Sequence, residues 1–224
     1  AIDESATLFE ALELIDDHDV RVLPVTDKDK RLKGYVSIFQ MGDYFVPKFR
    51  EPRAMRHVHT SINDVVTVLK ADVKCVRDED NIEDMYVKIG AMDIRSFGKI
   101  TDSDAIGANE TIIIVGDRWD IQQRSIQIGV RLLVITGSLG VDQEVIDLAR
   151  EKGVSLIISP YDSATTAWTI RTASRISKLI ETNSVTFGPD QRLNSISRRI
   201  ANSNAQAFMV IDENDRLIGL FTKT

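Results

Sequence analysis

Near the start of the chain, apolar residues recur at a helical spacing and then switch to the shorter runs of strands. Four apolar side chains of residues 5–17 fall on one helical face: Leu8, Ala11, Leu12 and Ile15. Either Ser5 or Thr7 can cap the start of this helix. A polar turn at 27–30 separates two short runs, 21–26 and 32–37, which predicts a β-hairpin. The opening of the chain therefore predicts a helix–strand–turn–strand unit.

The same unit returns near the end of the chain, in register and without a gap. Residues 27–37 read DKDKRLKGYVS and residues 212–222 read DENDRLIGLFT, a shift of 185 positions (212 minus 27). The second copy predicts a helix at 191–203, strands at 207–212 and 216–222, and a turn at 213–215. One such unit cannot bury both sides of its sheet, so the two copies are expected to pack on each other. The residues between them then form a separate, inserted domain.

The middle of the chain has a different pattern. Three short, nearly continuous apolar runs are typical of strands buried on both faces: 111–115, 132–136 and 156–159. Helical patterns at 119–129 and 142–152 lie between these runs, and Gly153 is expected to end the second. This alternation predicts a parallel sheet with right-handed crossovers. A helix at 61–70 with a Ser61 cap is expected before the sheet, and one long helix at about 162–181 after it.

These patterns indicate an α/β fold in which an α+β repeat pair encloses a mainly parallel α/β domain. The expected bounds are 1–60 for the first repeat and a basic connector (45–60), 61–182 for the inserted domain, and 183–224 for the second repeat.

Composition narrows the possible environments and partners. The 224 residues are 43% apolar and 28% charged, with a net charge of −6, which argues against non-specific binding to nucleic acid. The single cysteine, Cys75, excludes an internal disulfide and fits a reducing cytoplasm. No apolar run approaches the length of a membrane span, and the first residues do not show a signal-peptide pattern. The abrupt start and stop within elements suggest a piece of a longer protein.

The repeated unit resembles the CBS domain, which occurs in tandem pairs that commonly bind adenine nucleotides. The first copy carries the resemblance in its helix, its Leu23-Pro24-Val25 strand, its acidic turn and the sequence Gly34-Tyr35-Val36-Ser37. The second copy has Phe208-Met209-Val210 and Gly219-Leu220-Phe221-Thr222 at the matching places.

Residues from about 70 to 180 resemble the DRTGG domain. Gly116-Asp117-Arg118 follows one predicted strand and Thr136-Gly137 follows the next, with Ser138 in place of the last glycine of the family name. The order CBS, DRTGG, CBS resembles the regulatory insert of family II inorganic pyrophosphatases of clostridia-like bacteria.

That resemblance implies a parent enzyme that hydrolyses pyrophosphate with manganese or cobalt, in catalytic domains outside this chain. It implies that the insert binds AMP or ADP, which inhibit, and diadenosine polyphosphates, which activate. Two inserts would pair through their CBS repeats as a homodimer. This chain itself would hold no metal or other cofactor and no catalytic residue.

The resemblance also assigns candidate nucleotide-binding residues. Adenine would take hydrogen bonds from the backbone of the strand Ser184–Phe187 (Ser184, Val185 and Thr186), whose counterpart in copy one is expected to be missing. Ribose or phosphate would contact the hydroxyls of Ser37 and Thr222. Gln40 stands where the family has a ribose-binding carboxylate.

A phosphate-binding side chain is expected just before the first strand of each hairpin. Arg21 supplies the cation that a phosphate needs, and its repeat mate is Gln206. Next to this pair, His18 is matched by Ser203 and Asp19 by Asn204, and Lys223 is a further cation candidate.

Several of these assignments have alternatives. Arg21 could be a solvated residue at a strand edge, and Ser37 and Thr222 could serve only as strand formers. Asp117 and Arg118 could hold a ligand at the end of a parallel strand or form an ion pair that fixes a loop. His57 and His59 share one side of a strand, but the sequence places no third ligand with them, so no metal site is predicted.

The sequence therefore predicts a nucleotide-sensing module that is not itself an enzyme. Two other classes stay open. The DRTGG domain could carry an acyl-phosphate-type activity of its own, or the chain could be a structural dimerisation insert with no ligand.

Overall fold

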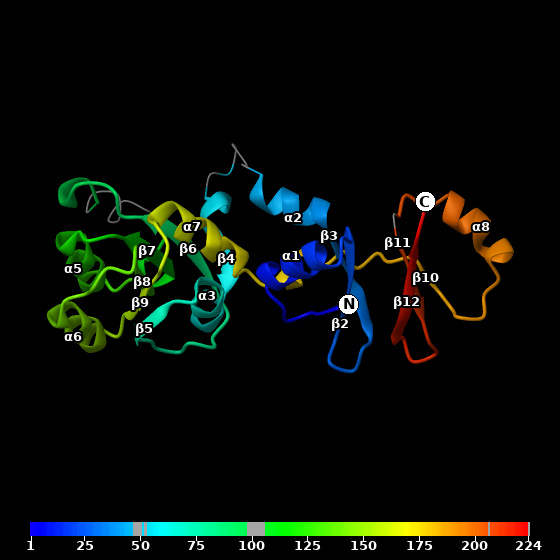
Figure 1. Cartoon of the computed structure of the whole chain (residues 1–224), viewed down its shortest axis with the longest axis horizontal. Helices are drawn as coiled ribbons and strands as arrows, with labels where there is room; N and C mark the ends of the chain where they lie inside the picture. The colour runs from blue at the N-terminus through cyan, green and yellow to red at the C-terminus, as the bar shows by residue number, and fades with distance from the viewer. Residues whose placement is uncertain (47–50, 52, 98–105, 206, 224) are drawn as a thin grey trace. The chain divides into compact units, whose positions relative to one another are not determined.

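The computed structural model describes residues 1–46, 51, 53–97, 106–205 and 207–223 (Figure 1). They form two compact units, one of residues 1–46 with 175–224 and one of residues 47–174. The middle unit thus starts and ends earlier than the expected 61–182. Its start includes β4 (His57–Thr60), within the expected connector, because this segment is hydrogen-bonded into the sheet of the middle unit.

The outer unit contains both repeats. Its first copy consists of β1 (Ile2–Asp3), α1 (Leu8–Asp17), β2 (Val22–Thr26), β3 (Leu32–Ser37) and α2 (Ile38–Phe45). Its second copy consists of β10 (Thr186–Phe187), α8 (Leu193–Ala201), β11 (Ala207–Ile211) and β12 (Leu217–Thr222), preceded by the 3-10 helix η3 (Ile176–Leu179).

The two copies have the same strand register. The pair Val25–Gly34 in the first copy corresponds to Val210–Gly219 in the second, and each hairpin has a bulge one residue later. The short parallel strands also correspond, because Ile2 pairs with Val25 as Phe187 pairs with Val210. The 185-residue shift places the counterparts of Ser184 and Val185 before residue 1 and those of Thr186 and Phe187 at Ala1 and Ile2. The expectation that copy one lacks this strand is therefore wrong only at Ile2, which pairs in β1 as Phe187 pairs in β10.

The first predicted helix is confirmed, with Thr7 rather than Ser5 at its start. The Thr7 hydroxyl accepts a hydrogen bond from the Glu10 backbone N–H, and Glu10 Oε2 accepts one from the Thr7 backbone N–H at 2.7 Å. This capping box satisfies two N–H groups that the first helical turn leaves without partners. The buried face of α1 carries Leu8, Ala11 and Ile15, as the apolar spacing predicts.

The middle unit is a six-stranded mixed sheet with the order β4-β6-β7-β8-β9-β5. Its other strands are β5 (Asp72–Cys75), β6 (Glu83–Ile89), β7 (Thr111–Val115), β8 (Leu132–Ile135) and β9 (Ser155–Ile158). Its helices are α3 (Ile62–Leu69), α5 (Trp119–Gln127), α6 (Gln143–Lys152) and α7 (Ser163–Thr172), with 3-10 helices η1 (Ala54–Arg56) and η2 (Ala108–Glu110).

Strands β7 to β9 are parallel, as predicted, and β6, which the sequence analysis did not predict, extends the parallel part of the sheet. The edges β4 and β5 are antiparallel. Helices α5 and α6 cover one face of the sheet, and α3 and α7 cover the other (Figure 1). All of β7 and β8 is buried. Cover on both faces explains why these strands are continuous apolar runs without alternation.

The prediction of one long helix at 162–181 is wrong for its second half. Helix α7 ends at Thr172, and the chain then bonds to copy one of the repeat: Ile176 N donates to Ala6 O at 3.0 Å. Further on, Glu181 pairs antiparallel with Tyr35. In a continued helix the N–H groups of Ile176 and Glu181 would bond within the helix. Here they donate to backbone carbonyls of copy one instead.

The linker lies tightly against Gly34. A Cβ at this position would stand 2.3 Å from Glu181 O and 2.7 Å from Ile180 Cγ2, and Gly34 has φ +151°. Its repeat mate Gly219 has no positive φ, and a Cβ there would meet nothing closer than Val210 Cβ at 3.9 Å. Close approach and backbone conformation therefore both require glycine at position 34.

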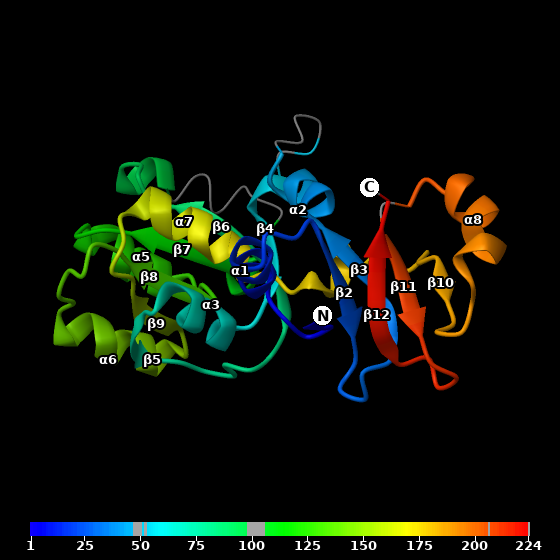
Figure 2. The same ribbon diagram turned by 45° about the vertical axis from the view of Figure 1, so that its right-hand side comes forward.

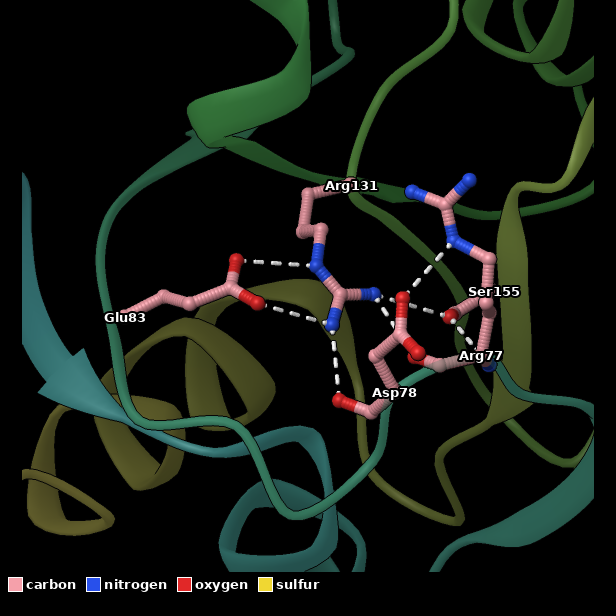
Figure 3. A network of polar contacts seen from close by, with 5 residues as sticks. All are labelled: Arg77, Asp78, Glu83, Arg131 and Ser155. Carbon is pink, nitrogen blue, oxygen red and sulfur yellow. Dashed lines mark hydrogen bonds and ion pairs between the residues drawn. The ribbon is translucent and has the colours of Figure 1, made fainter.

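One buried arginine joins several segments at the amino end of the parallel strands (Figure 3). Arg131 is 5% exposed, and its Nε and Nη2 donate to the two Glu83 oxygens at 2.9 and 3.0 Å. Its remaining N–H groups donate to Arg77 O, Asp78 O and Ser155 Oγ. All five donors of the guanidinium are thus satisfied, which is the condition for burying this charge.

None of the described helices has the length and apolar character needed to cross a membrane.

We predict that Glu83→Gln lowers the free energy of unfolding of the middle unit by about 3 kcal/mol. The substitution leaves the buried Arg131 charge uncompensated, and the partial exposure of Glu83 keeps the loss at the low end for buried pairs. Both tryptophans, Trp119 and Trp168, belong to this unit, so tryptophan fluorescence during urea unfolding reports on it.

The matched control is Glu79→Gln, an exposed carboxylate outside the Arg131 network. Its unfolding midpoint should change by less than the equivalent of about 0.5 kcal/mol. Equal shifts for the two variants would contradict a stabilising role for the buried pair.

We also predict that Gly34→Ala destabilises the repeat unit by about 2 kcal/mol or more, because the linker backbone must move. Gly219→Ala is the repeat-matched control, and its free energy of unfolding should stay within about 1 kcal/mol of that of the unsubstituted chain. Circular dichroism during urea unfolding measures the loss. Tryptophan fluorescence should not shift, because the repeat unit contains no tryptophan. A similar effect of both substitutions would show that the linker contact is not the cause.

Candidate functional site

The two repeats meet through the tips of their hairpins (Figure 2). Arg31 and Arg216, which are repeat mates, form an antiparallel bridge. Leu32 N donates to Asp215 O and Leu217 N donates to Lys30 O, both at 2.9 Å. Because the 185-residue shift exchanges these two bonds, a pseudo-twofold axis passes through the bridge.

Both hairpin tips are held by the same aspartate. Asp27 Oδ1 accepts hydrogen bonds from the Asp29 and Arg31 backbone N–H groups, and Asp212 Oδ1 accepts from Asn214 and Arg216 in the same way. The hydrogen bond from the Arg31 N–H is the main cause that lowers the pKa of the Asp27 carboxyl. The acidic turn of each repeat thus presents the backbone that joins the two copies.

A cleft of about 800 Å³ opens between the repeats. Its lining residues come from both copies: Asp19, Val20, Arg21 and Val22 from the first, and Ser203, Asn204, Ala205, Leu220, Thr222 and Lys223 from the second. The volume lies in the range of small-molecule sites. The mates Asp19/Asn204 and Val20/Ala205 both take part, so the cleft straddles the pseudo-twofold axis.

Five of the ten predicted site residues line this cleft: Arg21, Ser203, Asn204, Thr222 and Lys223. Sequence reasoning paired Asp19 with Asn204 without listing it as a site residue, and it missed the lining residues Val20, Val22, Ala205 and Leu220. Val20 lies between Asp19 and Arg21 in the chain, so the turn after α1 was the available signal for it.

The charged groups of the cleft differ in how they are held. The Arg21 side chain is exposed, and the structure records no hydrogen bond or ion pair for it within the described residues. Lys223 Nζ instead donates to Ser203 O and lies 5.9 Å from the centre of the Phe208 ring. Asp19, with φ +48°, is the one carboxylate among the lining residues. Arg21 is therefore the cation best placed to meet an incoming anion.

The second copy supplies a preformed wall. Ser203 Oγ accepts a hydrogen bond from Ala205 N at 3.0 Å, which fixes the turn that follows α8. Thr222 and Leu220 lie on the exposed face of β12. Hydroxyl and apolar groups therefore stand together on this side, as a nucleoside requires.

Ser37, the mate of Thr222, has a different place. It is buried as the N-cap of α2, where its hydroxyl donates to Gln40 Oε1 at 2.8 Å. Gln40 completes this capping box by accepting a hydrogen bond from Ser37 N at 2.7 Å. Neither residue is among those that line the cleft, and Gln40 serves to start a helix.

The strand expected to bind adenine lies beside β11. Val185 O accepts a hydrogen bond from Met209 N, and Thr186 pairs with Met209 in the parallel ladder. Ser184 Oγ is buried and has no hydrogen-bond partner within the described part of the chain. None of these three residues is among those lining the cleft. Gln206 lies outside the described residues.

Arg118 in the middle unit forms an ion pair, with Asp120 rather than Asp117. Arg118 Nη2 lies 2.7 Å from Asp120 Oδ2, and Nη1 donates to Met92 O. The arginine thus fixes the loop before α5. The hydrogen bond from Arg118 is the main cause that lowers the pKa of Asp120.

The two histidines of β4 share one carboxylate oxygen. His57 Nε2 and His59 Nδ1 lie 2.9 and 2.8 Å from Asp84 Oδ1 on the neighbouring strand β6. Within the described chain, no three histidine, cysteine, aspartate or glutamate side chains are grouped so that they could hold a metal ion.

Family models match both parts of the chain. The model described as "CBS domain" matches residues 1–41 and 176–224, and the model described as "DRTGG domain" matches residues 64–173.

Two curated proteins are similar over nearly the whole chain. The cobalt-dependent inorganic pyrophosphatase of Clostridium perfringens is 24% identical over 211 residues, which are 93% of this chain and 37% of that protein. The probable manganese-dependent inorganic pyrophosphatase of Thermotoga maritima is 22% identical over 219 residues, which are 96% of this chain and 38% of that protein. The chain thus spans less than two fifths of the length of these relatives.

One solved structure matches the whole fold. It contains the CBS and DRTGG domains of the regulatory region of Clostridium perfringens pyrophosphatase, complexed with the activator diadenosine tetraphosphate. The TM-score is 0.83 at 22% identity, covering 99% of this chain and 94% of that chain. The chain is therefore built of a CBS domain pair with a DRTGG domain between its repeats, and it is homologous to the matching region of the clostridial pyrophosphatase.

Proposed function

We propose that this chain is the adenine-nucleotide-sensing region of a cytoplasmic inorganic pyrophosphatase that depends on manganese or cobalt. In this proposal AMP and ADP inhibit, and diadenosine polyphosphates activate, through a homodimer of the CBS repeats. The pyrophosphatase activity and its metal belong to other domains of the same polypeptide.

The observation that carries the proposal is the cleft at the pseudo-twofold axis of the CBS pair. It combines an exposed cation, Arg21, with the hydroxyl wall of Thr222 and an apolar floor that includes Leu220. Arginine suits this role because its planar guanidinium can donate two parallel hydrogen bonds to a phosphate. Asp19 is the one lining carboxylate, so repulsion of a phosphate is small.

Regulation requires that the ligands distinguish two states of the parent enzyme. A dinucleotide could span two clefts of a homodimer, whereas two AMP molecules would fill them separately. Bridging favours one relative orientation of the two subunits, and separate occupancy allows another. Only the difference in affinity between these states can change the activity of the catalytic domains.

We predict that Arg21→Ala weakens AMP binding about 10-fold, the value expected when an exposed charged hydrogen-bond donor to a phosphate is lost. Isothermal titration calorimetry of the chain with AMP measures the change. Adenosine has no phosphate, so its affinity should be the same for the unsubstituted chain and for the Arg21→Ala variant.

Arg192→Ala is the control for loss of charge, because Arg192 lies at the other end of α8 and outside the cleft lining. The AMP affinity of this variant should stay within about 2-fold of that of the unsubstituted chain. An unchanged AMP affinity in Arg21→Ala would remove Arg21 from the phosphate site.

We further predict different stoichiometries for the two kinds of ligand. AMP should saturate at about one molecule per chain and diadenosine tetraphosphate at about one per two chains, because one long ligand would occupy two clefts. Calorimetry gives both ratios. The absence of heat and of a thermal shift with either ligand would refute the sensor and favour a structural dimerisation insert.

A further inference from the structure

The outer edge of β3 is closed by the linker that leads into the second repeat. Tyr35 N donates to Glu181 O at 3.1 Å, and Glu181 N donates to Tyr35 O at 2.9 Å. The residue opposite Tyr35 on β2 is Pro24, which has no N–H, so Tyr35 turns its N–H and C=O groups outward. In copy one, the edge strand β3 is therefore covered by the linker that continues into copy two.

Strand β12 has the same edge in the second repeat. Met209 N donates to Val185 O, away from β12, so Met209 and Leu220 form a pair without mutual hydrogen bonds. Leu220 therefore turns its N–H and C=O groups outward, as Tyr35 does. At the start of β12, Leu217 N donates to Lys30 O, but within the described residues no segment bonds to this edge at Leu220. Leu220 is 45% exposed and Ile218 is 54% exposed.

Gly219 gives a second, independent indication. In copy one the linker passes so close to Gly34 that only glycine fits there. Gly219 occupies the matching position of copy two, yet neither its φ nor its nearest neighbour requires glycine. A glycine with open space beside an uncovered edge is what close approach of another backbone needs.

We propose that the edge of β12 binds an extended segment of the same polypeptide, the residues that lead into Ala1. The pseudo-twofold relation selects this occupant. The linker that enters copy two lies on copy one, so the segment that enters copy one is expected to lie on copy two, antiparallel to β12 at Leu220. The inference rests on one part of the proposed function, namely that this chain belongs to a longer pyrophosphatase polypeptide.

The location gives the docked segment a regulatory consequence. Leu220 and Thr222 also line the nucleotide cleft. Strand β12 therefore meets the nucleotide with its side chains and the entering segment with its backbone edge. A ligand that moves β12 acts directly on the segment that connects the CBS pair to the rest of the polypeptide, without passing through the DRTGG domain.

Hydrogen–deuterium exchange tests this pairing in the absence of nucleotide. The Leu220 amide is compared between the 224-residue chain and the parent polypeptide, with the Tyr35 amide as the internal reference. Tyr35 should be protected in both proteins. Leu220 should exchange at least about 10-fold more slowly in the parent polypeptide, because its N–H is then hydrogen-bonded.

A fast Leu220 amide in both proteins would overturn the proposal. Protection in the 224-residue chain that grows with protein concentration would also overturn it, because a second copy would then cover the edge. Concentration-independent protection in that chain would show that the edge is closed from within, with the same result.

A second measurement uses Gly219→Val in the parent polypeptide. The added side chain should block close approach and return the Leu220 amide to fast exchange, while the Tyr35 amide stays protected. Persistent protection of Leu220 would contradict the role assigned to Gly219. Neither experiment involves a nucleotide, so failure of this pairing is distinguishable from failure of the nucleotide sensor, which calorimetry tests separately.

Discussion

The backbone bridge between Arg31 and Arg216 is the contact on which the outer unit depends. Each repeat is a three-stranded sheet with its own buried apolar cluster, around Leu8 and Val25 in copy one and around Phe187 and Phe208 in copy two. Two hydrogen bonds of 2.9 Å at the hairpin tips join the repeats, and Asp27 and Asp212 shape those tips. Because the bridge lies on the pseudo-twofold axis, the mates Asp19 and Asn204 both line the same cleft.

Because of departures from this symmetry, the two copies contribute different residues to the cleft lining. In copy one, Ser37 begins α2 and Tyr35 pairs with the linker, so the end and the outer edge of β3 are occupied. In copy two, the matching residues Thr222 and Leu220 line the cleft instead. Each copy contributes a cation to the lining, Arg21 from copy one and Lys223 from copy two, and Arg21 itself has glutamine as its mate. A repeated sequence has thus produced a cleft that is lined by different side chains from its two copies.

The middle unit can be inserted in the sequence between the two repeats because it has a complete core of its own. Both faces of its sheet are covered by helices, and Arg131 joins the ends of three segments through five satisfied donors. Breaking such a buried charge pair is costly, whereas its net contribution over an apolar replacement is small. Its main consequence here is geometric, since it fixes the loop of Arg77 and Asp78 to the start of β9 through Ser155.

The sequence alone determined the features that depend on local spacing or on exact repetition. These are the capped helix α1, both hairpins, the parallel order of β7 to β9, and the relation between Arg21 and its cleft neighbours Ser203 and Asn204. Tertiary structure alone decided the rest. Helix α7 stops at Thr172 because Ile176 and Glu181 find backbone partners in copy one, and β1 exists because two residues meet the edge of β2. Ser37 is the N-cap of α2 and does not line the cleft, whereas its mate Thr222 lines it. Long-range hydrogen bonds outweigh local propensity at these places, and no pattern along the chain records which partner a backbone group will meet.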